Sequence, residues 1–157
     1  MIVEKQDISD AFSILHDGTI ESYEQQHNSI LLKISCIYLA ELIHSSFQYF
    51  WIELKDVYSI SLQPWLKDSQ KIFFWTDLKL IFQKDLEILN ANITAEETVK
   101  VVCECMDIFE GEEISYVGGT LEFDCHSICV FDESEREVSL DTLKKTATQY
   151  WGNFTNQ

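Results

Sequence analysis

The chain has 157 residues, of which 46% are apolar and 13% aromatic, with one proline and five glycines. This composition excludes a disordered or low-complexity chain. The length suits a single domain, residues 1–157, that buries roughly two thirds of its unfolded surface. The 27 acidic and 11 basic residues give a net charge of −16, which opposes binding to nucleic acid or anionic lipid and favours a basic partner.

The negative charge is concentrated in one segment. Residues 96–137 contain 13 acidic and 2 basic side chains, a net charge of −11. A solvated surface and a surface that binds a basic partner both explain such a segment, because net charge governs solubility and association rather than fold.

The sequence also predicts a compartment. No apolar run approaches the roughly 20 residues of a membrane-spanning helix, and the first ten residues, MIVEKQDISD, lack the basic and apolar regions of a secretory signal. The five cysteines are an odd number without the regular spacing of a disulfide framework. We therefore expect a cytoplasmic protein with reduced thiols.

A helix and a turn are predicted at the start of the chain. The helix covers residues 7–15, with Asp7 as its N-cap. Its apolar residues share one side at the 3.6-residue period: Ile8, Ala11, Phe12 and Leu15. A turn follows at His16-Asp17-Gly18, where glycine accepts a positive φ without steric cost.

Two-residue alternation then predicts a β-meander. Strands are expected over residues 19–25 and 30–36, separated by a polar break in which Asn28 tolerates a left-handed conformation. Residues 38–46 form a short helical bridge. The even positions from Phe50 to Leu62, Tyr58 included, share the core face, which fits either one long bent strand or a hairpin at residues 55–56. Pro64 ends the meander because proline cannot donate to a ladder.

The second half mixes both periods. Residues 76–89 have helical spacing and predict a central helix of about three turns capped by Thr76, although residues 86–93 could instead be a strand. Strands are expected over 98–105, where β-branched residues outweigh a capping-box spacing, and over 120–125 and 128–131, with a break at His126-Ser127. Ser139 caps a C-terminal helix that Gly152 ends.

This order of elements predicts an α+β fold. We expect an antiparallel β-meander, sandwich or partial barrel of about seven strands, with a central and a C-terminal helix. Parallel βαβ units would require a regular alternation of strands and helices, which the sequence lacks.

No motif for a nucleophile or a phosphate-binding loop is present, and we assign no catalytic residue, metal or cofactor. His16-Asp17 is the pair that metal-dependent phosphohydrolases use, but here it lies in a predicted turn. A small-molecule-binding or hydrolytic site near His16 and Asp17 is therefore the alternative function. Four cysteines, Cys103, Cys105, Cys125 and Cys129, suit zinc in their chemistry, but their spacing is more typical of buried apolar side chains.

The acidic loops and one aromatic pair are the candidate partner-binding residues. Tyr49 and Trp51 lie opposite the predicted core face, where they are either covered by a helix or exposed as anchors for a partner. The acidic candidates are Glu110, Glu112, Glu113, Asp132, Glu133, Glu135 and Glu137.

Three stretches of the sequence, LHDGTIESYEQQHNSILLKIS, FWIELKDVYSISL and GTLEFDCHSICVFDE, resemble a group of small bacterial proteins. These proteins open with a His-Asp-Gly turn into a β-meander, and some of them look like immunity proteins of polymorphic toxins. The resemblance implies no catalytic residues. Together with the acidic segment, residues 96–137, it leads us to expect a non-enzymatic binding protein, such as an immunity protein that masks a basic toxin domain. A structural subunit of an assembly is a further alternative.

Overall fold

The computed structural model describes residues 1–67, 70–105 and 115–155. Over these residues the chain forms one seven-stranded antiparallel sheet with four helices, which confirms the predicted α+β fold. In chain order the elements are α1 (Lys5–Ile14), β1 (Thr19–Gln26), β2 (Ser29–Ser35), α2 (Ile37–Ile43), β3 (Tyr49–Leu66), α3 (Leu78–Ile81), β4 (Leu86–Ile93), β5 (Val99–Cys105), β6 (Tyr116–Phe131), β7 (Glu137–Val138) and α4 (Leu140–Thr155).

The sheet closes on itself as a partial barrel. Its strand order is β3-β2-β1-β4-β5-β6-β7, and β3 also pairs with β6. The two closing contacts differ greatly in length. The β3–β6 ladder extends from Trp51 and Phe131 to Leu66 and Tyr116, whereas β1 pairs with β4 only at Thr19 and Ile20. The barrel is therefore held firmly at one seam and weakly at the other.

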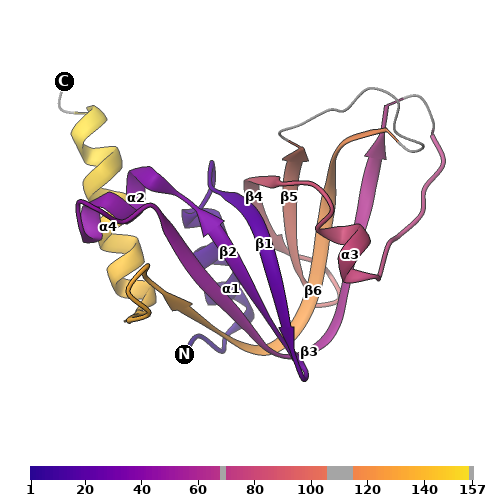
Figure 1. Ribbon diagram of the computed structural model, residues 1–157, viewed down its shortest axis with the longest axis horizontal. Helices are drawn as coiled ribbons and strands as arrows, with labels where there is room; N and C mark the ends of the chain where they lie inside the picture. Colours follow the sequence, from indigo (N-terminus) through magenta and orange to yellow (C-terminus); the bar gives the residue numbers. More distant parts are fainter. Residues whose placement is uncertain (68–69, 106–114, 156–157) are drawn as a thin grey trace.

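Strands β3 and β6 are long and bent, and they run through both arms of the sheet (Figure 1). Strand β3 bends where Asp56 adopts a φ of 49° and the register shifts between Val57 and Ser59. The long bent strand is confirmed and the hairpin is wrong. Because the bulge changes the alternation, Tyr58 is 67% exposed and not on the core face.

Two predicted strand breaks are wrong. Pro64 lies inside β3, buried and beside a second register shift, which is a position where a strand tolerates a missing N–H group. Strand β6 continues through His126 and Ser127 without interruption, because the neighbouring residues pair with β3 on both sides of them.

Helix α1 packs on the inner face of the sheet, against β4, β5 and α4, and lies behind β1 and β2 in Figure 1. Its predicted apolar side is confirmed, since Ile8, Ala11 and Phe12 are fully buried. The Phe12 ring packs 5.3 Å from that of Phe123 in β6. The predicted N-cap is wrong: the N-cap is Glu4, three residues before Asp7, and it makes no side-chain cap.

The turn after α1 is confirmed, but its residues have different roles from those predicted. Asp17 has the positive φ, 66°. Gly18 is required by close approach, because a Cβ atom there would lie 2.7 Å from the carbonyl oxygen of Leu15. In the next turn His27, not Asn28, has the positive φ, 53°.

The predicted three-turn central helix is wrong. Helix α3 has a single turn, and Asp77 rather than Thr76 caps it by accepting from the N–H of Lys79 at 2.9 Å. Residues 86–93 form the strand that was the alternative. Leu86 and Ile88 are buried there by pairing with β5, and Leu89 lies at a register shift that leaves it 38% exposed.

Helices α4 and α2 lie together at one end of the sheet (Figure 1). Ser139 caps α4, as predicted, by accepting from the N–H of Thr142 at 3.1 Å, while the helix continues past Gly152. The rings of Tyr38 and Tyr150 join the two helices at 4.5 Å. None of the helices in the described ranges is long and apolar enough to cross a membrane.

Candidate functional site: an acidic hollow with an aromatic floor

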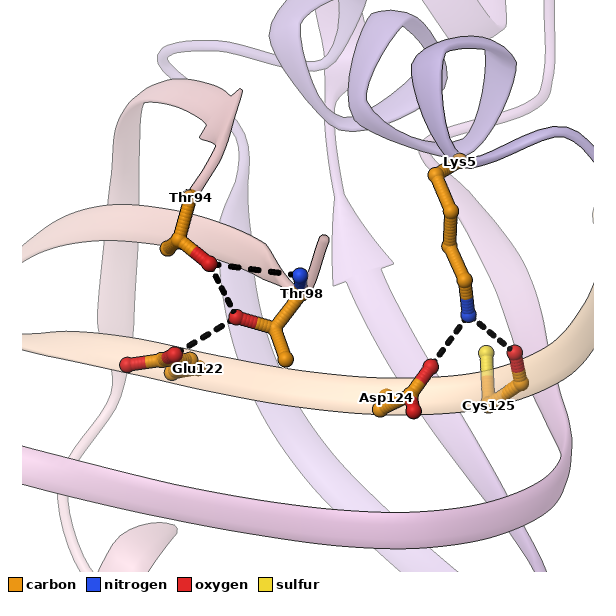
Figure 2. Close-up of polar contacts among 6 residues, drawn as sticks. All are labelled: Lys5, Thr94, Thr98, Glu122, Asp124 and Cys125. Atoms are coloured by element: carbon orange, nitrogen blue, oxygen red, sulfur yellow. Dashed lines mark hydrogen bonds and ion pairs between the residues drawn. The ribbon is translucent and has the colours of Figure 1, made fainter. Parts of the chain in front are cut away.

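Part of the acidic segment stabilises the fold. The Thr98 hydroxyl donates to the Glu122 carboxylate at 2.5 Å, next to the hairpin that joins β4 and β5 (Figure 2). The Asp124 carboxylate pairs with the ammonium of Lys5 in α1, which also donates to the carbonyl oxygen of Cys125 at 2.7 Å. These two carboxylates therefore tie other elements to β6.

Asp132 likewise has an internal role. It is 6% exposed, and its Oδ1 atom accepts from the N–H and the hydroxyl of Ser134 at 2.9 and 2.7 Å and from the N–H of Arg136 at 3.1 Å. These bonds fix the turn between β6 and β7. The carboxylate of Asp132, a predicted partner-binding residue, is thus enclosed by its own turn.

The other predicted acidic residues differ in their surroundings. Glu133 accepts from the N–H of Gln48 at 3.0 Å. Glu137 binds the N-terminal ammonium group of Met1, and this hydrogen bond lowers the pKa of the Glu137 carboxyl. Glu135 is exposed, in a turn where its φ is 67°. The remaining candidates, Glu110, Glu112 and Glu113, lie outside the described residues.

Strands β1, β2, β3 and β6 carry a hollow of about 450 Å³ on the face opposite the core. Cross-strand register builds it: Glu24 is opposite Leu31, Leu31 is opposite Glu53, and Trp51 is opposite Phe131. Leu31, Trp51, Glu53 and Phe131 alternate with buried residues, and Glu24 is paired with Leu31, so their side chains share the outer face. The hollow is lined by Glu24, Leu31, Trp51, Glu53, Phe131 and Glu135; we call it the acidic hollow.

The acidic hollow combines negative charge with an apolar floor. Among the described residues, none forms an ion pair or side-chain hydrogen bond with the carboxylates of Glu24, Glu53 or Glu135. The side chains of Trp51 and Phe131 line the same hollow as these carboxylates and provide aromatic surface there. An ammonium or guanidinium group is attracted both to an aromatic face and to a carboxylate, so this arrangement suits a lysine or arginine side chain.

Tyr49 extends the aromatic surface next to the acidic hollow. Its ring meets that of Trp51 edge to face at 5.6 Å. The ammonium of Lys33 lies 4.4 Å from the centre of the Tyr49 ring and 3.8 Å from a carboxylate oxygen of Glu21. A cation of the protein itself is thus already held on this face by one ring and one carboxylate.

The structure brings Trp51 and Glu135, both predicted, into one site with four residues that were not predicted. Glu24, Leu31, Glu53 and Phe131 come from four strands, and only the pairing register brings them together. A signal was present in the sequence for one of them, because Glu53 alternates with core residues in the same strand as Trp51.

In the turn that contains His16 and Asp17, His16 is held by several contacts within the protein, whereas Asp17 is exposed. The Nδ1 atom of His16 lies 2.8 Å from the carbonyl oxygen of Ser13, its ring stacks on Trp151 at 5.3 Å, and Tyr38 donates to its carbonyl oxygen at 2.5 Å. Asp17 approaches the imidazole only to 3.9 Å. An open hollow of about 330 Å³ between α1 and α4 adjoins His16; the catalytic alternative stays a prediction.

The five thiols are buried and form no disulfide with one another. Burial raises the pKa of Cys36 and of Cys103 to about 12 and that of Cys125 to about 11. In the part of the chain that the structure describes, no three His, Cys, Asp or Glu side chains converge as metal ligands would.

Comparison of this chain with protein-family models, with curated protein sequences and with solved structures gives no match.

Proposed function

We propose that this protein is a non-enzymatic binding protein that masks a basic protein partner, and that the acidic hollow receives a lysine or arginine side chain of that partner. The resemblance to immunity proteins suggests a toxin domain as the partner. The observation that carries the proposal is the placement of Glu24, Glu53 and Glu135 around Trp51 and Phe131.

The energetics favour recognition of a cation on this surface. A cation over an aromatic ring contributes about 0.5–1 kcal/mol when exposed and about 2 kcal/mol or more when desolvated. The net charge of −16 steers a basic partner toward the protein and raises the association rate at low salt. The aromatic floor then supplies the buried anchor that interfaces typically have at their centre.

The test is a titration of the protein with a synthetic arginine-rich peptide. Calorimetry and the NMR signal of the Trp51 indole N–H monitor binding. We expect binding at an ionic strength of about 0.01 M and its loss near 1 M, where the Debye length falls from about 30 to about 3 Å. Absence of binding at low ionic strength would contradict the proposal.

Single variants localise the binding. Trp51→Ala should weaken peptide binding by about 2- to 30-fold, the range that corresponds to about 0.5–2 kcal/mol. Glu53→Gln should weaken it as well. The matched control is Glu41→Gln, which removes the same charge from an exposed position on α2 and should leave the affinity nearly unchanged. Equal losses for Glu53→Gln and Glu41→Gln would show that only the net charge matters.

The toxin assignment has its own test. When the product of the neighbouring gene is expressed in a host cell, co-expression of this protein should protect the cell from its toxicity. The double variant Trp51→Ala, Glu53→Gln should not protect the cell at equal abundance. Protection by the double variant would place the interface elsewhere on the protein.

A further inference from the structure

Strand β1 has one open edge. On one side it pairs with β2 over its whole length, from Thr19 to Gln26. On the other side it pairs with β4 only at Thr19 and Ile20. Beyond Ile20 no described residue continues the ladder on that side, and residues 21–26 are exposed apart from the half-buried Tyr23.

The register shows which peptide groups face the open edge. Gln26 and Ser29 flank the two-residue loop of the β1–β2 hairpin, so they form the closing hydrogen-bonded pair. Since hydrogen-bonded and non-hydrogen-bonded pairs alternate, Glu24 bonds to β2 in the same way. The N–H and C=O groups of Tyr23 and Gln25 therefore point away from β2, toward the open edge.

A hollow lies next to this edge strand on each of the two faces of the sheet. On the outer face is the acidic hollow, which Glu24 lines. On the other side is a second hollow of about 390 Å³, between the end of β1, the bend of β3 and the start of α3; Gln25, Ile30 and Leu78 are among its lining residues. Two successive residues of β1, Glu24 and Gln25, thus border one hollow each.

We propose that a basic segment of the partner binds in extended form as an additional strand on the open edge of β1. Successive side chains of such a strand point to opposite faces, so alternate residues would lie beside Glu24, where the acidic hollow meets the edge, and beside Gln25, at the second hollow. Main-chain hydrogen bonds provide affinity in this binding mode, and the two hollows provide selectivity. This inference rests on the proposed function and specifies how the partner is held.

Charge complementarity identifies the occupant as a basic segment. The edge strand carries Glu24 and Glu21, of which Glu21 pairs with Lys33, and Glu24 shares the acidic hollow with Glu53 and Glu135. A second copy of this chain would bring its own Glu21 and Glu24 against these residues, and like charges directly opposite each other destabilise a strand pair. The same charges, with the bulge between Ile20 and Ser22, discourage self-association through this edge.

The test compares three arginine-rich peptides of identical sequence: one unmodified, and two with N-methyl groups on the odd or on the even residues. Methylation removes a donor without changing the charge. Because all odd amides of a strand point to one edge and all even amides to the other, only one methylated peptide should lose binding, by about tenfold or more, since several hydrogen bonds of a few-fold each disappear. Equal affinities for the two methylated peptides would overturn the inference.

A variant of the protein tests the same edge. Gln25→Pro removes an outward N–H group and no bond of the β1–β2 ladder, and proline is tolerated on an edge strand whose N–H faces solvent. It should fold, as circular dichroism would show, and bind the unmodified peptide several-fold more weakly than Gln25→Ala, which loses the same side chain but keeps the N–H group. If Gln25→Pro fails to fold, the methylated peptides decide alone.

The outcomes separate the two proposals. Binding that depends on Trp51 and Glu53 but is indifferent to Gln25→Pro and to the position of methylation would keep the proposed function and reject strand addition. No binding of the unmodified peptide at low ionic strength would reject both.

Discussion

The turn between β6 and β7 should depend on the carboxylate of Asp132 for its stability. Truncation by Asp132→Ala removes the acceptor of three hydrogen bonds and leaves the N–H groups of Ser134 and Arg136 without that partner. Asp132 is 6% exposed, so water can replace the lost acceptor only in part.

The magnitude follows from those bonds. A buried donor left unsatisfied costs about 1–3 kcal/mol, and partial access of water to the turn reduces the cost of two such donors to about 2–3 kcal/mol in total. For a chain of this size each kcal/mol lowers Tm by about 2–4 °C. We therefore expect Asp132→Ala to melt about 4–12 °C below the natural sequence, and Asp132→Asn, which keeps one acceptor oxygen, to melt between the two.

The assay is urea unfolding monitored by tryptophan fluorescence, and the matched control is Glu135→Gln. Glu135 belongs to the same turn but is exposed, so its variant should change stability by less than about 0.5 kcal/mol and weaken binding of the cationic peptide. Asp132→Ala should shift the urea midpoint with an unchanged slope. An unchanged midpoint for Asp132→Ala would refute the assignment of its carboxylate to the turn.

Three further outcomes are expected. Gly18→Ala should destabilise the fold by about 1–3 kcal/mol, since its Cβ would lie 2.7 Å from a backbone oxygen, whereas Gly152→Ala, with open space around it, should not; thermal melting measures both. Burial, with Asp17 and Glu104 nearby, raises the pKa of Glu87. The folded state thus binds this proton more tightly, and Glu87→Gln should increase stability at neutral pH but not below about pH 4. Native-state alkylation should leave Cys103 unmodified, because burial raises its pKa to about 12.

Local patterns were sufficient to predict much of the fold. The alternation of apolar and polar residues predicted the strand from Ile30 to Ile34 and the buried face of β5. Helical spacing of apolar residues predicted the buried side of α1. These predictions depended on contacts that repeat every two or 3.6 residues. The errors arose where tertiary contacts select the structure. Leu86 and Ile88 fit both the helical and the strand period, and their residues form a strand because they pair with β5.

The candidate site was less predictable because it depends on register. Trp51 and Glu135 could be selected as an aromatic residue opposite the predicted core face and as an acid of the acidic segment, but nothing in the sequence states that Glu24 would be near Glu53. The acidic segment was also misleading, since Glu122, Asp124 and Asp132 form contacts within the protein. The density of charge along the chain does not show which carboxylates are already paired.

The long β3–β6 ladder has a consequence for biosynthesis. During translation the β1–β3 meander emerges from the ribosome well before Tyr116–Phe131 exists to complete the other side of β3. Until then a long strand with apolar residues such as Phe50, Ile52 and Leu54 presents an unpaired edge, which favours aggregation. Contacts so distant in sequence also predict slow refolding, on the scale of milliseconds to seconds for sheet-rich domains, and a dependence on chaperones that remain bound until the C-terminal third has been synthesised.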